Sequence, residues 1–96
     1  MITLVLADDH PLIREGIRSI LSKTPDIRII GEAQDGHEAQ KLVEQLQPQI
    51  LLLDLEMPGP MSVQIAQWVR TNCPKTVTLV LTAPDPDAYL PKFRPN

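Results

Sequence analysis

Short apolar runs alternate along this chain with segments in which apolar residues recur at helical spacing. The runs have the length of strands and are rich in Ile, Leu and Val, as expected of strands that are covered on both faces. Such alternation is typical of βαβ units, in which helices connect parallel strands. The sequence therefore predicts an α/β fold with four parallel strands, at residues 3–7, 27–33, 50–53 and 77–81.

Three helices are predicted between the strands, over residues 11–23, from Asp35 to the residue before Pro48, and from Ser62 to Asn72. Asp35 and Ser62 are of residue types that cap helix N-termini, and Pro48 cannot continue a helix. In chain order, the expected apolar stripes are Ile13, Gly16, Ile17, Ile20 and Leu21; Ala39, Leu42, Val43 and Leu46; and Ile65, Ala66 and Val69, with Trp68 beside them.

The composition indicates one small, mildly acidic domain of 96 residues with a net charge of -3. This charge leaves no basic stripe of the kind that nucleic-acid binding requires. The apolar runs are too short to span a membrane, and the lone Cys73 cannot form an internal disulfide. We therefore expect a cytoplasmic protein that makes no direct contact with nucleic acid or membrane.

Carboxylates follow two of the predicted strands: Asp8 and Asp9 the first, Asp54 the third. Right-handed crossovers favour the strand order 2-1-3-4, which brings these strand ends together at the carboxyl edge of the sheet. Two carboxylates about 4 Å apart repel by roughly 4 kcal/mol at an effective dielectric of about 20. A hard divalent cation relieves this repulsion, and oxygen ligands favour Mg²⁺.

Each of these signals has a structural alternative. An Asp after a strand often forms a turn or a helix cap, and Asp8 and Asp9 could cap the helix that begins at Pro11. His10 is expected to be a loop or capping residue rather than a metal ligand. Thr82 follows the fourth predicted strand, on the other side of Asp54 in this strand order. Capping does not require complementary groups on the three loops that carry Asp8 and Asp9, Asp54, and Thr82, so their convergence favours a functional site.

Three motifs carry a resemblance to a known family. They are LVLADDHPLIREG at residues 4–16, LLLDLEMPG at residues 51–59 and LVLTA at residues 79–83. Together they resemble a bacterial two-component response-regulator receiver domain, and the first motif resembles the NarL/FixJ-type branch. The match covers roughly residues 2–83, and it implies the flavodoxin-like, doubly wound fold of receivers.

The resemblance also implies a function and a set of site residues. A sensor histidine kinase would phosphorylate Asp54, which acts as the nucleophile. Mg²⁺ would be held by Asp9, Asp54 and the backbone carbonyl of Glu56, with Asp8 helping through a water molecule. Thr82 occupies the position of the hydroxyl residue that contacts the phosphoryl group and reports phosphorylation. Such a domain transfers a phosphoryl group to itself and is not a turnover enzyme.

The sequence departs from the family after residue 83. We expect a truncated receiver over residues 1–83 and a proline-rich tail over residues 84–96, without a fifth strand or an output domain that binds DNA. Lys92 of the tail is not assigned the role of the family's fifth-strand lysine, so Mg²⁺ binding is expected to be weak and phosphorylation slow or absent. Ser62 stands where the family commonly has glycine, and Pro60 stiffens the loop before it.

Loss of the fifth strand predicts an exposed edge at residues 77–81, and an exposed edge favours a homodimer through this fourth strand. Tyr89 and Phe93 are expected to cover part of the opened surface. Two alternatives to phosphoacceptor function stay open. One is an interaction module that pairs with other regulators or a kinase without accepting phosphate. The other is a phosphatase-like enzyme with Asp54 as nucleophile and Glu56 as acid.

Overall fold

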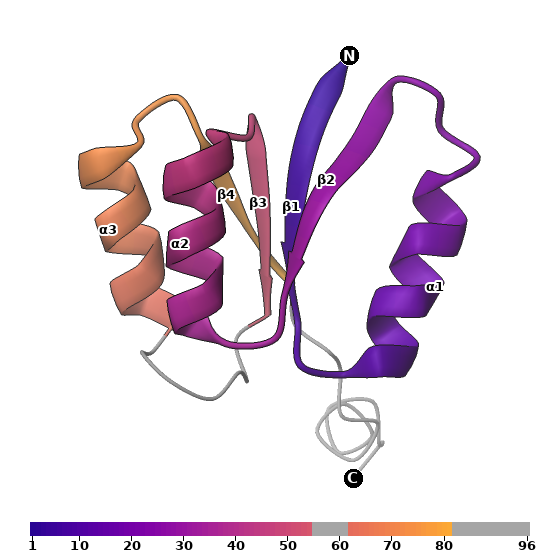
Figure 1. The fold of residues 1–96 in the computed structure, drawn as a ribbon, viewed down its shortest axis with the longest axis horizontal. Helices are drawn as coiled ribbons and strands as arrows, with labels where there is room; N and C mark the ends of the chain where they lie inside the picture. Colours follow the sequence, from indigo (N-terminus) through magenta and orange to yellow (C-terminus); the bar gives the residue numbers. More distant parts are fainter. Residues whose placement is uncertain (55–61, 82–96) are drawn as a thin grey trace, which may run out of the picture.

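The computed structural model of the chain describes residues 1–54 and 62–81. Within these ranges, four parallel strands form one sheet in the order β2-β1-β3-β4, and helices connect them (Figure 1). The elements are β1 (Ile2–Ala7), α1 (Pro11–Leu21), β2 (Ile27–Ala33), α2 (Gly36–Leu46), β3 (Ile50–Asp54), α3 (Ser62–Asn72) and β4 (Val77–Leu81). The predicted α/β fold and strand order are confirmed.

The helix predicted over residues 11–23 ends slightly earlier, at Leu21. The backbone N–H groups of Lys23 and Thr24 donate to carbonyls three residues before them, on Ile20 and Leu21. This spacing is that of a 3₁₀ turn, which tightens the chain as the helix ends.

The predicted N-cap of the second helix is confirmed. Asp35 Oδ1 accepts a hydrogen bond of 2.8 Å from the backbone N–H of Glu38, as an N-cap side chain does. The helix ends at Leu46, and Gln47 follows in the left-handed conformation with φ 48°. Pro48 comes next, so the helix stops where the sequence predicts.

Helices α2 and α3 cover one face of the sheet, which we call the closed face (Figure 1). Ile65 and Val69 of the predicted α3 stripe are fully buried there, whereas Ala66 is only half-buried. The closed face contains one continuous apolar core, formed by Val5, Ala7, Ala33, Ala39, Val43, Leu51, Leu53, Ile65, Val69 and Cys73.

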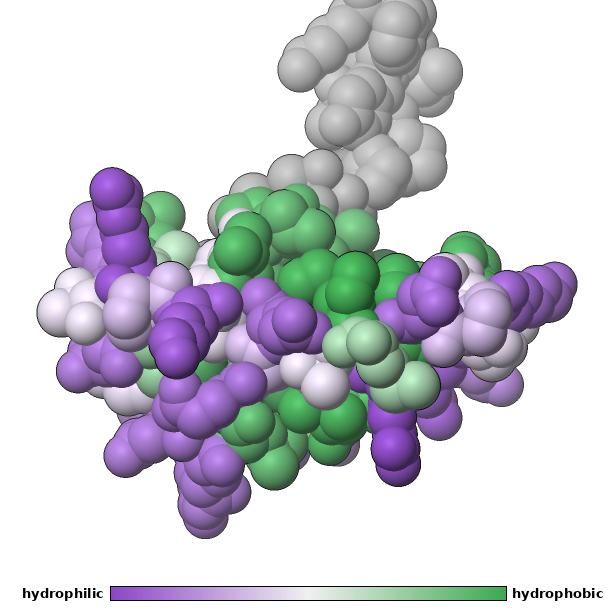
Figure 2. All heavy atoms as spheres, turned by 90° about the horizontal axis from the view of Figure 1, so that it is seen from above, coloured by the Kyte–Doolittle hydropathy of each residue, from purple (hydrophilic) through white to green (hydrophobic). Residues whose placement is uncertain are grey.

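Helix α1 lies against the opposite face, which we call the open face (Figure 1). In the described part of the chain α1 has no buried residue: Ile13, Ile17 and Leu21 of its stripe are half-buried, and Ile20 is 67% exposed. Viewed from the end where the strands begin, hydrophilic side chains gather on the two helical flanks and apolar ones form a band between them (Figure 2). The open face therefore has much less apolar burial than the closed one.

The register of the strands decides what meets at the carboxyl edge. Ala7 of β1 lies opposite Leu53 of β3, and Asp54 lies opposite Leu81 of β4. Because Asp8 follows Ala7 and Asp54 follows Leu53, the two acidic residues leave their strands side by side.

The pairing of β2 with β1 contains a β-bulge. Leu4 lies opposite Ile29, whereas the next residue, Val5, lies opposite Gly31. Ile30 is therefore an extra residue in β2, and such residues bend a strand and increase its twist.

No helix within the described residues is long and apolar enough to cross a membrane. Several sequence-based predictions concern residues outside the described ranges. These are the roles of Glu56, Pro60, Thr82, Tyr89, Lys92 and Phe93 and the proline-rich tail at residues 84–96.

Candidate metal centre

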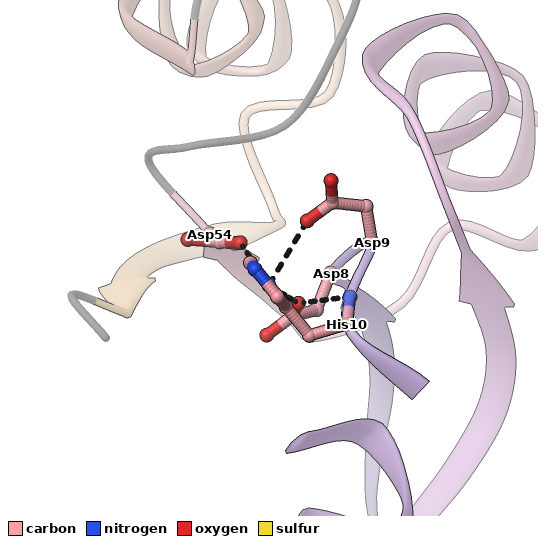
Figure 3. Close-up of side chains that lie close together, drawn as sticks. All are labelled: Asp8, Asp9, His10 and Asp54. Carbon is pink, nitrogen blue, oxygen red and sulfur yellow. Dashed lines mark hydrogen bonds and ion pairs between the residues drawn. The ribbon is translucent and has the colours of Figure 1, made fainter. Parts of the chain in front are cut away.

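Four side chains converge at the carboxyl edge of the sheet: Asp8, Asp9 and His10 from the β1–α1 connection, and Asp54 from the end of β3 (Figure 3). We call them the acidic cluster. Each offers one ligand atom, and these four atoms lie within 4.8 Å of one another. Asp8 and Asp54 are fully buried, whereas Asp9 and His10 are partly exposed. The three carboxylates thus meet as the strand order predicts.

The backbone of Asp8 is held from two directions. Its N–H donates to the carbonyl of Ala33 at the end of β2 over 3.0 Å, and its own carbonyl accepts a hydrogen bond of 2.8 Å from Arg14 Nη1. The side chain turns towards the residues that follow, where Oδ1 accepts a hydrogen bond of 2.8 Å from the backbone N–H of His10. The other carboxylate oxygen, Oδ2, is buried and accepts no hydrogen bond from the described residues.

His10 is the N-cap residue of α1, but its side chain does not cap the helix in the described structure. The ring points into the acidic cluster instead (Figure 3). Its Nδ1 lies 2.9 Å from Asp8 Oδ1, 3.0 Å from Asp9 Oδ1 and 3.5 Å from Asp54 Oδ2. His10 therefore occupies the predicted capping position, but its side chain contacts the carboxylates and does not cap the helix. Capping of α1 does not explain Asp8 and Asp9.

The environment of His10 raises the pKa of its imidazole above the usual value. The hydrogen bond to Asp8 is the main cause, because it favours the protonated ring. Partial burial acts in the opposite direction, and the negative charges of Asp9, Asp8 and Asp54 add to the increase. The sequence contained a signal for this contact, since His10 directly follows two carboxylates at a strand end.

Asp54 is the last residue of β3, and its backbone carbonyl is fixed by Ser62. The Ser62 hydroxyl donates a buried hydrogen bond of 2.7 Å to this carbonyl. The sequence predicts Ser62 as the N-cap of α3, but Ser62 is already the first helical residue and its side chain bonds to Asp54 instead. Residue spacing alone gives no signal for this contact, because it depends on where α3 begins relative to the end of β3.

The acidic cluster fits a hard divalent cation. It combines three carboxylates, two of them fully buried, and buried carboxylates are costly unless a positive charge or hydrogen bonds satisfy them. The buried Asp8 Oδ2, which accepts no hydrogen bond within the described residues, is an oxygen that such a cation could bind. Carboxylate oxygens are also the ligands that Mg²⁺ prefers in proteins.

Comparisons with known proteins agree with this geometry. A model of the response regulator receiver domain family matches residues 4–93. The nitrate/nitrite response regulator protein NarL of Escherichia coli K12 is 47% identical over 68 residues, which cover 71% of this chain and 32% of that protein. The transcriptional regulatory protein YxjL of Bacillus subtilis is 36% identical over 89 residues, which cover 93% of this chain and 41% of that protein.

A solved structure gives the same result. The signal receiver domain of the putative response regulator NarL from Mycobacterium tuberculosis superimposes with a TM-score of 0.82 at 37% identity, over 95% of this chain and 73% of that one. This chain spans less than half the length of the two curated relatives above. The family match, these relatives and the strand order confirm the resemblance that the motifs carry. This chain belongs to the response regulator receiver domain family.

Proposed function

We propose that this domain acts in two-component signal transduction by accepting a phosphoryl group on Asp54 from a sensor histidine kinase, with Mg²⁺ as cofactor. The observation that carries the proposal is the acidic cluster: the buried Asp54 carboxylate lies with Asp8 and Asp9 within a 4.8 Å group of ligand atoms. A nucleophilic carboxylate beside a cation-binding pair is the arrangement that phosphoryl transfer to aspartate requires.

Each residue of the cluster has a role in the proposal. A carboxylate oxygen of Asp54 attacks phosphorus as the bond from phosphorus to the kinase's histidine nitrogen breaks, which leaves an acyl phosphate on Asp54. Asp8, Asp9 and the backbone carbonyl of Glu56 would hold Mg²⁺ together with Asp54. When bound, Mg²⁺ supplies positive charge that neutralises the transferring group. Thr82 is proposed as the hydroxyl that contacts the phosphoryl group.

Acetyl phosphate and MgCl₂ provide a direct test. Intact-mass spectrometry is expected to show addition of one phosphoryl group, at a rate that the sequence predicts to be slow. Asp54→Asn is expected to abolish the addition, and Asp26→Asn, which changes a carboxylate in the loop before β2, is the matched control. Phosphorylation that persists in Asp54→Asn, or that is absent from the unaltered protein even after long incubation, contradicts the proposal.

The proposal also includes a homodimer through β4. Among the described strands β4 lies at the edge of the sheet, and Val77, Leu79 and Val80 are each about half exposed. Val77–Leu81 contains no charged residue. An uncharged apolar edge strand is a template for pairing with another chain, since nothing on it opposes association.

Sedimentation equilibrium tests the dimer. Leu79→Lys is expected to yield a monomer, and Ile20→Lys, which places the same charge on the exposed side of α1, is expected to leave the dimer intact. A monomeric unaltered protein at micromolar concentration contradicts this part of the proposal. The same measurements address a second candidate function, that of an interaction module. Such a module would associate without accepting a phosphoryl group, and Asp54→Asn would leave its association unchanged.

A further inference from the structure

Arg14 connects α1 to the acidic cluster through the backbone of Asp8. Its Nη1 donates a hydrogen bond of 2.8 Å to the Asp8 carbonyl. The side chain of Arg14 is only 14% exposed, although α1 as a whole has no buried residue in the described structure. A guanidinium that is removed from water and bonded to a carbonyl makes a charge-assisted hydrogen bond, which is stronger than a neutral one.

Glu32 of β2 fixes the other side of the guanidinium. Arg14 Nε lies 3.6 Å from Glu32 Oε1, and Arg18 Nε lies 3.3 Å from Glu32 Oε2. The next residue of β2, Ala33, accepts the Asp8 N–H. The Asp8 backbone is therefore tied to β2 twice, directly through its N–H and through Arg14 and Glu32 at its carbonyl.

A guanidinium suits this arrangement, because one of its nitrogens bonds to a backbone carbonyl while another lies in ion-pair range of a carboxylate. Lysine carries the same charge on one nitrogen and lacks the forked guanidinium. The backbone that Arg14 holds leads directly into Asp9 and His10, so its position sets where two further members of the acidic cluster lie (Figure 3).

Two effects of Arg14 on cation binding have opposite signs. As a positive charge near three carboxylates, it repels a divalent cation, so its removal would strengthen binding. As a clamp on the Asp8 backbone, it keeps the ligands in place, so its removal would weaken binding. Mg²⁺ demands near-ideal octahedral geometry and is sensitive to ligand displacement. Partners that orient metal ligands change metal affinity by about 10- to 100-fold when mutated.

We infer that Arg14 is a positioning residue of the acidic cluster, which holds the Asp8 backbone so that the carboxylates can bind a divalent cation. The inference rests on the proposed function, since it takes Mg²⁺ as the cation. It assigns to α1 a role in the site that does not depend on contact with the cation or the phosphoryl group.

The test is titration of the protein with MgCl₂ by isothermal calorimetry and by NMR, below the unfolding temperature of each variant. Arg14→Ala and Arg14→Lys are both expected to bind Mg²⁺ about tenfold more weakly than the unaltered protein. Arg18→Ala is the matched control, because it removes the other ion pair to Glu32 without touching Asp8. Its affinity is expected to stay within about twofold, and its Asp8 and Asp9 amide resonances are expected to move less than those of the Arg14 variants.

The outcomes separate the inference from the proposal beneath it. If the unaltered protein binds Mg²⁺ and Arg14→Ala binds it equally or more tightly, the inference is wrong and the proposed function stands. If Arg14→Lys binds as the unaltered protein does, charge alone suffices and the clamp is refuted. If the unaltered protein does not bind Mg²⁺, the proposed function fails and the inference with it. Glu32→Gln, which loosens Arg14 without removing it, is expected to give an intermediate loss of affinity and covers the case in which Arg14→Ala does not fold.

Discussion

On its closed face the sheet buries a continuous apolar core under α2 and α3, whereas on its open face α1 contributes no buried residue among those described. The closed face is held by packing. On the open face Leu6 of β1 is also fully buried, and polar contacts hold α1 as well, above all those of Arg14 and Arg18 with Glu32 and of Arg14 with Asp8. Arg14 lies near the end of α1 that leads out of the acidic cluster, whereas Arg18 lies in the last turn of the helix.

The difference has an energetic meaning. Full burial of a leucine or valine side chain contributes about 1.5–3 kcal/mol, whereas an exposed ion pair contributes roughly 0–1 kcal/mol. The closed face should therefore supply most of the stability of the described structure. The open face should supply less, and its contacts should matter more for the geometry of the acidic cluster than for folding.

Core truncation should show the largest contrast. Leu51→Ala is expected to lower the free energy of unfolding by about 2–5 kcal/mol, because Leu51 is fully buried and its loss leaves a cavity. Ile17→Ala, in the half-buried stripe of α1, is expected to lower it by about 1 kcal/mol. Urea unfolding of both variants measures the difference. Equal losses would show that the open face is packed as tightly as the closed one.

Two serines that make similar hydrogen bonds offer the next contrast. Ser62 donates to the Asp54 carbonyl in a buried position, and Ser22 donates to the Ser19 carbonyl in an exposed one, both over 2.7 Å. Ser62→Ala is expected to lower the free energy of unfolding by about 1–3 kcal/mol, since a buried acceptor loses its donor. Ser22→Ala should change it by less than about 0.5 kcal/mol, because water replaces the hydroxyl. A neutral Ser62→Ala in thermal unfolding would speak against a structural role for this bond.

Hydrogen exchange should resolve the two faces without mutation. Backbone amides of α1 are expected to exchange through openings of lower free energy than those of α2, because less apolar surface must be exposed to open α1. Added salt should accelerate exchange in α1 more than in α2, since it screens the ion pairs to Glu32. Native-state exchange followed by NMR gives both values. Similar protection in α1 and α2 at every salt concentration would remove the contrast.

The smallest effect concerns protonation at the acidic cluster. Without a divalent cation the folded-state pKa of His10 is raised, chiefly by its hydrogen bond to Asp8. The stability that His10 contributes is therefore present below its unfolded-state pKa and lost as the pH rises through its folded-state pKa. MgCl₂ is expected to lower the folded-state pKa, because the cation competes for the same carboxylates. NMR titration of the His10 ring at constant ionic strength, with and without MgCl₂, measures the shift; an unchanged pKa would indicate that Mg²⁺ binds elsewhere or not at all.

The sequence predicts the fold well because the fold depends on regular patterns. Apolar runs and helical stripes determine the order of the elements, Asp35 and Pro48 mark the ends of α2, and right-handed crossovers leave few strand orders. The convergence of the three carboxylates follows from that order, so it too is predictable.

The remaining features depend on side-chain directions in connections, which periodicity does not determine. The ring of His10 turns into the acidic cluster although its backbone caps α1, and Ser62 bonds to Asp54 although its type and position suggest a cap. The partial exposure of α1 could not be predicted from the sequence either. A stripe such as that of Ile13 and Ile17 shows which side of a helix is apolar, but it does not show how much of that side the sheet covers.

The bulge in β2 changes which face of the sheet the later side chains of that strand point to. Successive residues of a strand point to opposite faces, and one additional residue reverses this alternation for everything that follows. Because the bulge accommodates Ile30 as an extra residue, Glu32 lies opposite Leu6 and faces α1, where it meets Arg14. If Ile30 instead paired regularly with Val5, Glu32 would lie opposite Ala7 and direct its charge into the apolar core. The bulge thus decides whether this carboxylate anchors a helix or disrupts the interior.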